Sequence, residues 1–289
     1  MKQKQTITIL IGAIIILSAT AALVGIITTG GPGNFGYVTI RGETVTIYGK
    51  GIYKHMSADV AIQGIAQDVV TLFIGIPLLL FSLFGFRKSS VKNRFLLTGV
   101  TGYFFVTYLF YTAMGMYNEL FLVYVTLLGL TFFALFNLFI SFDIKIISEY
   151  FSVKAPAKFT GGFLIFNSIA IALMWLGRVI PPLLDGSVYP VDLQHYTTMI
   201  VQGFDLGLLL PVSFVAGWLL LKKRPMGFLI GVPYIVFLSV LMSALSAKII
   251  AMGINGVNII PAVFIIPAIN LVTIVCAVLM VKNTKENKV

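Results

Sequence analysis

Charged residues are scarce in this sequence, and the shortage excludes whole classes of protein. They make up 10% of the 289 residues, whereas soluble domains have roughly 25%. Hydrophobic residues account for 58% of the chain, and its mean hydropathy is +1.01. So few charges cannot cover a surface that faces water. The composition therefore excludes a soluble enzyme and a nucleic-acid-binding domain.

Cysteine and histidine are scarce as well. Cys276 is the single cysteine, which excludes a disulfide framework and a metal cluster built from cysteines. The two histidines, His55 and His195, are far apart in the sequence and form no metal-ligand motif. The sequence also lacks the common nucleotide-binding, zinc-protease and serine-hydrolase motifs. We therefore expect no metal and no cofactor.

Long apolar segments are what the chain has in abundance. A helix that crosses hydrocarbon about 30 Å thick needs about 20 apolar residues, at about 1.5 Å each. Backbone groups find no hydrogen-bond partners in lipid, so the segments should be helical. The predicted fold is an all-α integral membrane bundle of eight transmembrane helices, a single domain over residues 1–289. The expected spans are 7–29, 62–86, 95–116, 120–142, 161–183, 199–221, 227–251 and 258–281.

The basic residues predict the orientation of the bundle. The first apolar segment follows Lys2 and Lys4, but it is longer than the 7–15 residues, roughly, of a signal-peptide core. We expect an uncleaved helix with its N-terminus in the cytoplasm. Loops on the opposite side then carry only Arg41, Lys50 and Lys54, as the positive-inside rule requires. This places both termini in the cytoplasm and the protein in the cell membrane, so the net charge of +10 does not indicate nucleic acid.

Two segments suggest an internal repeat. GIAQDVVTLFIGIPLLLFSLFGFRK surrounds Asp68, and VQGFDLGLLLPVSFVAGWLLLKK surrounds Asp205. In both segments the aspartate is followed by a proline and then by basic residues at the end of the span. The number of residues between aspartate and proline differs between the two segments by about one helical turn. The interpretation is a parallel repeat of two four-helix halves, residues 1–142 and 143–289. The alternative is that apolar helices resemble one another by composition alone.

The longest loop, residues 30–58, has a pattern typical of strands. Tyr37–Ile40 and Thr44–Gly49 alternate around Arg41-Gly42-Glu43, which predicts a small extracytoplasmic β-hairpin. An isolated hairpin is marginally stable in water, so it should pack onto the bundle. It is either a lid over a pocket or a simple cover for helix ends.

Four charged side chains fall inside the expected spans: Asp68, Arg178, Asp205 and Lys248. Charges in hydrocarbon are costly, so they usually face the interior of a bundle and pair. Counting from the ends of the spans places all four near one level, close to the outer boundary. We expect an outward-facing polar pocket there. Alternatively, Lys248 extends to the head groups and Arg178 forms a structural ion pair with an aspartate.

Two more residues complete the set of candidate ligand-binding residues. Glu119 lies near the same level, and His195 lies in the loop before the sixth span. The segment DLGLLLPVSFVAGWLLLKKRPMGFLIG, from Asp205, resembles uncharacterised prokaryotic multi-pass membrane proteins. That resemblance implies no activity and no site residues.

Three functions remain open from the sequence. In a transporter-like or ligand-binding protein, Asp68 and Asp205 would bind a cation, a proton or an amine, and Arg178 and Lys248 would balance them or hold an anionic group. In an intramembrane enzyme acting on lipids or prenyl groups, an aspartate or His195 would be the general base. The third function is a non-catalytic scaffold or sensor subunit. The expected partners are the lipid bilayer and a small-molecule, ion or lipid ligand, without nucleic acid.

Overall fold

The computed structural model describes residues 2–286. Over this part of the chain, eight helical segments are long and apolar enough to cross a membrane, which confirms the predicted number of spans. They indicate a multi-pass membrane protein. The segments are α1 (Lys2–Ile27), α2–η2–α3 (Ala58–Arg87), α4 (Val91–Ala113), α5 (Phe121–Ile140), α6 (Ala157–Leu184), α7–η5–α8 (Ile200–Leu221), α9 (Pro225–Ile254) and α10 (Ala262–Lys282).

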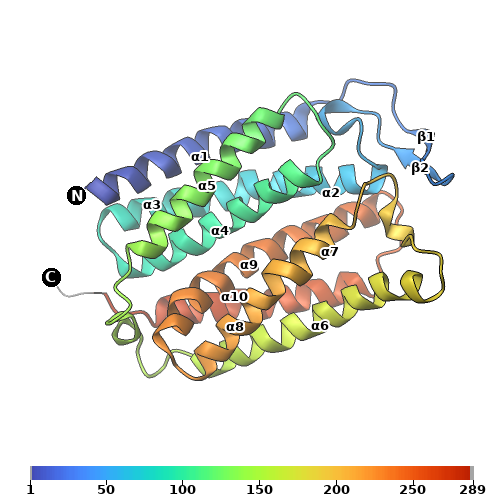
Figure 1. The fold of residues 1–289 in the computed structure, drawn as a ribbon. Coiled ribbons are helices and arrows are strands. Elements are labelled where there is room, and N and C mark those ends of the chain that lie inside the picture. Colours follow the sequence, from blue (N-terminus) through green and yellow to red (C-terminus); the bar gives the residue numbers. More distant parts are fainter. Residues whose placement is uncertain (1, 287–289) are drawn as a thin grey trace.

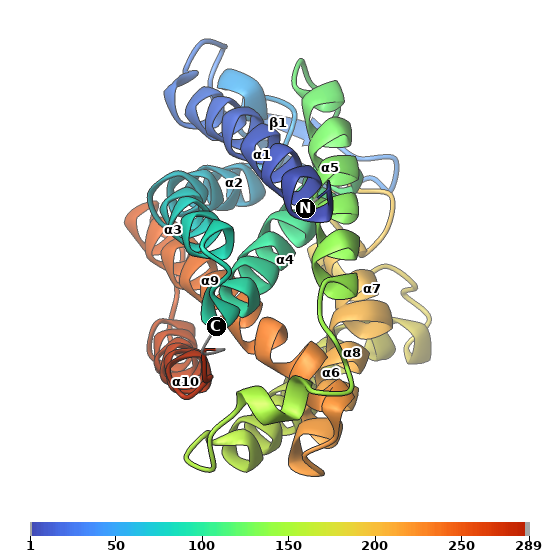
Figure 2. The same ribbon diagram turned by 90° about the vertical axis from the view of Figure 1, so that its left-hand side faces the viewer.

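The helices run side by side along one bundle axis. The start of α1 and the end of α10 lie at one end, called here the terminal end, and a hairpin lies at the other, the hairpin end (Figure 1). Viewed along the axis, α4 and α9 occupy the centre, with α1, α2, α3 and α5 toward one side and α6, α8 and α10 toward the other (Figure 2). Because α4 and α9 pack against each other, they join the two groups of helices.

The second and sixth spans are interrupted at matching places. In each span a five-residue π-helix, η2 (Thr71–Gly75) or η5 (Asp205–Leu209), precedes a 12-residue α-helix, α3 or α8. The second residue of that helix is a proline, Pro77 or Pro211. Proline has no N–H to donate inside a helix, and a π turn is a common way to accommodate the missing bond.

The matching continues into the next turn. Three residues separate α3 from α4 and α8 from α9, and the middle one has positive φ, 65° at Ser89 and 51° at Lys223. Each of these landmarks recurs 134 residues further along the chain. Under this correspondence Asp205 is equivalent to Thr71. Asp68 lies three residues before Thr71. Residues three apart are neighbours on a helix surface, so the two aspartates lie one turn apart on comparable faces.

The predicted hairpin is confirmed. Strands β1 (Phe35–Val38) and β2 (Thr44–Ile47) pair antiparallel, with Phe35 opposite Ile47. Arg41, in the turn, donates hydrogen bonds to the carbonyl oxygens of Gln194 and Tyr196. The hairpin therefore packs onto the loop between α6 and α7 rather than standing free.

Candidate functional site

Asp68 is enclosed by three separate parts of the chain. It lies near the end of α2 (Ala58–Val70), and 2% of its surface is exposed. The hydroxyl of Tyr53, in the short helix η1 (Gly51–Tyr53), donates to Oδ2, and the hydroxyl of Tyr111, in α4, donates to Oδ1 at 2.9 Å. On the other side, Gly25 of α1 passes so close that an added Cβ would overlap Oδ2. Burial raises the pKa of Tyr53, as does the nearby Asp68 carboxylate, so the phenol stays protonated and remains a donor.

Polar side chains continue from Asp68 toward the middle of the bundle. Gln67 Nε2 donates to Tyr103 Oη at 2.8 Å and to Thr107 Oγ1 at 3.0 Å. Thr71 Oγ1 lies 2.8 Å from the same Tyr103 hydroxyl. The sequence interpretation did not single out the tyrosines of α4. Tyr103, Thr107 and Tyr111 are spaced by four residues, and that stripe on one helix face is the signal that could have found them.

Asp205 has a more open setting. It is the first residue of η5 and is half-buried. The indole of Trp175, on α6, donates to Asp205 Oδ2 at 2.7 Å. No other hydrogen bond to this carboxylate occurs within residues 2–286.

Lys248 lies on a helix that contacts both aspartate-bearing spans. It lies on α9, which packs against α2 on one side and α8 on the other, and its side chain is half-buried. Asp68 lies on α2 and Asp205 in the π-helix directly before α8, so Lys248 is on the helix that packs against both spans. In the described part of the chain, however, it forms no hydrogen bond and no ion pair. Asp68, Asp205 and Lys248 are called here the three-charge site.

Arg178 is engaged elsewhere. Its Nη1 atom lies 2.8 Å from Asp192 Oδ2, and both side chains are largely exposed. Asp192 belongs to the short helix η4 (Val191–Leu193) in the loop between α6 and α7. Arg178 thus links the end of α6 to this loop and, within residues 2–286, forms no ion pair with Asp68 or Asp205.

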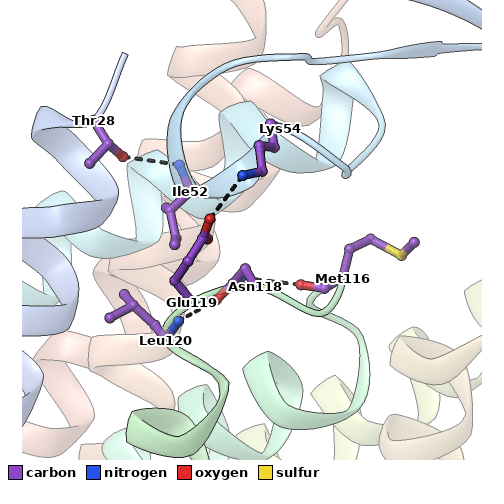
Figure 3. A network of polar contacts seen from close by, with 7 residues as sticks. All are labelled: Thr28, Ile52, Lys54, Met116, Asn118, Glu119 and Leu120. Atoms are coloured by element: carbon purple, nitrogen blue, oxygen red, sulfur yellow. Dashed lines mark hydrogen bonds and ion pairs between the residues drawn. The ribbon is translucent and has the colours of Figure 1, made fainter. Parts of the chain in front are cut away.

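Glu119 is exposed, and its side chain faces that of Lys54 (Figure 3). Lys54 Nζ approaches its Oε1 to 2.8 Å, and the Lys54 bond holds the pKa of Glu119 below its usual value. The backbone N–H of Ile52 donates to Thr28 Oγ1 at 3.0 Å. Tyr53 lies between Ile52 and Lys54 in the sequence. The Ile52–Thr28 and Lys54–Glu119 contacts therefore fix the segment whose Tyr53 hydroxyl donates a hydrogen bond to Asp68.

His195 packs among aromatic rings at the hairpin end. Its Nε2 atom is 3.1 Å from the carbonyl oxygen of His55, and its ring lies 4.6 Å from that of Tyr196 and 6.2 Å from that of Tyr37. Burial lowers the pKa of His195. None of the hydrogen bonds in residues 2–286 joins His195 to a carboxylate, so the arrangement shown is not that of an aspartate–histidine general base.

Other kinds of site find little support in the part of the chain that the structure describes. No group of three His, Cys, Asp or Glu side chains there is close enough to hold a metal ion. No family model, curated protein or solved structure matches the chain. The chemistry of the three-charge site is therefore the basis for a functional proposal.

Proposed function

We propose that this multi-pass membrane protein binds a proton or a small monovalent cation at the three-charge site and acts as a transporter. The site opens outward, both termini lie in the cytoplasm, and the protein resides in the cell membrane. The positive-inside distribution of Lys and Arg supports this orientation. The start of α1 and the end of α10 lie at one end of the bundle, opposite the hairpin, which agrees with it (Figure 1).

The observation that carries the proposal is the position of Lys248 on α9, which packs against the helix that bears Asp68 and against the span that bears Asp205; within residues 2–286 Lys248 forms no ion pair with either. Two ionised carboxylates and one ammonium leave one negative charge without a partner. Uncompensated charge inside a membrane costs several kcal/mol, roughly, so the group is driven to take up one positive charge. One proton or one monovalent cation supplies it, and Lys248 then serves as the fixed counter-charge.

The backbone near the site supports reversible binding. Asp205 begins one π-helix, and Asp68 precedes the other by three residues. Irregular backbone at membrane depth is tolerated where it lines a cavity or is buried in protein, and transporter sites commonly form at interrupted helices. Asp205, half-buried and with a single hydrogen-bond donor, is the carboxylate that exchanges the proton or cation.

We further infer that residues 1–142 and 143–289 form a parallel repeat. The supporting observation is the recurrence of the π-helix, the proline, the 12-residue helix and the positive-φ turn at a constant separation of 134 residues. Similarity of apolar composition does not account for a constant separation of backbone features. A repeat that places a binding site between its halves is typical of transporters.

The experiment uses Trp175 as a built-in reporter. The chain has two tryptophans, so Trp218→Phe leaves Trp175, whose indole binds Asp205. Its fluorescence is recorded in lipid vesicles between about pH 4 and pH 10, a range that includes ordinary carboxyl and ammonium pKa values. Na⁺ and K⁺ are then titrated against a bulky organic cation. We expect emission to change with pH or with the small cation.

The variants decide the assignment. Asp205→Asn should abolish the response, whereas Asp68→Asn and Lys248→Met should move its midpoint by at least about one pH unit or tenfold in cation concentration. A response that persists unchanged in all three variants rejects the site. Transport is tested with a pH-sensitive dye trapped in the vesicles, where an imposed cation gradient should move protons or cations in the Trp218→Phe protein but not in its Asp205→Asn derivative. Binding without movement rejects transport.

A further inference from the structure

A groove on the side of the bundle lies away from the three-charge site. It runs between α3, α4, α9 and α10 and has a volume of about 550 Å³. Its walls are mainly apolar, with Leu78, Val240 and Val278 among them, and Lys282 lies at its terminal end. This is called here the α3–α10 groove. Its volume falls within the range of roughly 300–1,000 Å³ that is typical of ligand sites.

The molecule contains a second groove built from matching residues. It runs between α8, α9, α4 and α5 and has a volume of about 190 Å³; it is called here the α8–α5 groove. Lining residues of the two grooves pair at the same separation of 134 along the chain. The pairs are Ile74 and Leu208, Leu78 and Val212, Leu96 and Ile230, Val236 and Gly102, and Val240 and Val106.

One pair contributes to the difference in volume. Where Ser239 lines the α3–α10 groove, the matching position in the α8–α5 groove is Phe105. A phenyl ring occupies space that a serine hydroxymethyl leaves open. Ser239 therefore leaves the α3–α10 groove wider at this position than Phe105 leaves its counterpart.

The terminal ends of the grooves also differ in charge. Ile274 and Val278 of α10 match Leu135 and Phe139 of α5, at a separation of 139 residues. Lys282 follows Val278 by four residues, and Asp143 follows Phe139 by the same number. Lys282 is exposed and, within residues 2–286, forms no ion pair. A nearby acid, Glu286, accepts hydrogen bonds from Ser90 and from the first N–H groups of α4, so it is already engaged.

We propose that the α3–α10 groove binds an acyl chain of an anionic phospholipid, with the phosphate of the head group at Lys282. The groove faces the hydrocarbon that surrounds a multi-pass protein, and a lipid tail supplies the matching apolar surface. Lipid phosphate carries the charge complementary to Lys282, at the end of the bundle where the basic loops gather. In the α8–α5 groove, the smaller volume disfavours the same ligand, and no charged residue of the described chain is among its lining residues.

The dimensions favour a lipid tail over a helix of a second protein. The segment from Ile274 to Lys282 spans about 12 Å at about 1.5 Å per residue. That length is less than half of the roughly 30 Å that a membrane-spanning helix of a second protein covers. A flexible acyl chain is narrower than a helix and can follow the groove.

The test counts phospholipids retained by the purified protein in native mass spectrometry, after exchange into mixed phosphatidylglycerol and phosphatidylcholine. Wild-type protein should retain phosphatidylglycerol preferentially. Lys282→Gln should weaken that retention about fivefold, because this is the gain in affinity that one lysine near an anionic head group provides. Ser239→Phe should reduce the retention of both lipids, because it gives the groove the residue of its narrower counterpart. If Ser239→Phe does not fold, Val278→Trp fills the groove from an exposed position.

Matched variants complete the test. Lys158→Gln removes one charge at the terminal end outside the groove and should leave retention unchanged, as should soluble glycerol phosphate added as a competitor. Phe105→Ser should add lipid binding in the α8–α5 groove without preference for phosphatidylglycerol. Equal phosphatidylglycerol retention by wild type, Lys282→Gln and the groove-filling variant would overturn the proposal. Displacement by glycerol phosphate would also overturn it, because the acyl chain would then contribute little.

Discussion

Asp68 in the first half of the chain and Asp205 in the second lie beside the same kind of helix break, yet their surroundings differ. Asp68 is 2% exposed and receives hydrogen bonds from a loop tyrosine and a helix tyrosine, with Gly25 of α1 against its other side. Asp205 is half-buried and receives one hydrogen bond, from the Trp175 indole. The first carboxylate is held by three elements and the second by one.

Helix packing accounts for this difference. In the first half, α1 packs along α2, α3 and α5, which brings Gly25 against the helix that bears Asp68. In the second half, α6 packs mainly along α8. Similar interrupted helices therefore support a fixed carboxylate in one half and an accessible one in the other. We infer that Asp68 sets the geometry of the three-charge site and that Asp205 carries the exchange.

The largest expected effect tests how tightly Asp68 is held. Gly25→Ala adds a methyl group that overlaps Asp68 Oδ2, and the carboxylate cannot move without losing its bonds to Tyr53 and Tyr111. Overpacking together with broken buried hydrogen bonds should lower the free energy of unfolding by about 3 kcal/mol. The measurement is reversible unfolding in mixed detergent micelles.

A second glycine of α1 provides the control. A Cβ added at Gly12 meets no atom within 4 Å. Gly12→Ala should therefore leave stability unchanged or raise it by up to about 1 kcal/mol, because alanine favours the helix. Equal destabilisation by both substitutions would mean that Gly25 matters for the helix and not for Asp68.

A smaller effect compares the donors to the two carboxylates. Tyr53→Phe leaves a buried charged group with one hydrogen bond fewer and should cost about 2 kcal/mol of unfolding free energy. Trp175→Phe should cost less than about 1 kcal/mol, because water can replace the indole at a half-buried carboxylate. Both are measured by the same unfolding assay. The reverse order would contradict the assignment of Asp68 as the fixed member of the pair.

Much of the fold could be predicted from hydropathy alone. The eight spans and the hairpin follow from the lengths of the apolar segments and from the alternation around Arg41. The π-helices could not be placed, because Pro77 and Pro211 predict a disturbance but not its form. The equivalent features of the two halves are the π-helices and not the aspartates. For this reason an alignment of Asp68 with Asp205 is out of register by about one helical turn.

The candidate site was predictable only in part. Helix length places Asp68, Asp205 and Lys248 at similar depth, but depth does not say which way each side chain points. Arg178 lies at the same level and pairs with Asp192, because a long exposed side chain reaches the loop more easily than the interior. Tyr53 was hidden from hydropathy, since it belongs to a loop that only the folded chain brings to Asp68.

The smallest expected effect concerns the loops that cover the two halves at the hairpin end. The loop after α6 packs against the hairpin through His195, whose Nδ1 atom is buried and has no hydrogen-bond partner within residues 2–286. Burial lowers its pKa below the ordinary value of about 6.5, so the opened loop binds a proton more readily than the packed loop. Packing is complete above about pH 6.5, and it weakens as the pH falls below that value toward the lower pKa of the packed state.

Hydrogen exchange can follow this difference between the loops. On acidification, the backbone amides of residues 192–198 should lose protection. Their hydrogen exchange, corrected for the pH dependence of exchange in an unfolded peptide, should become faster. Residues 51–53 should not lose protection, because Ile52 N–H donates to Thr28 Oγ1, and neither group of that hydrogen bond titrates. His195→Gln should remove the pH dependence of residues 192–198, since glutamine has no proton to gain. An equal response in both segments would instead show that the two loops open together, and the division between a fixed and an accessible half would then not extend to the hairpin end.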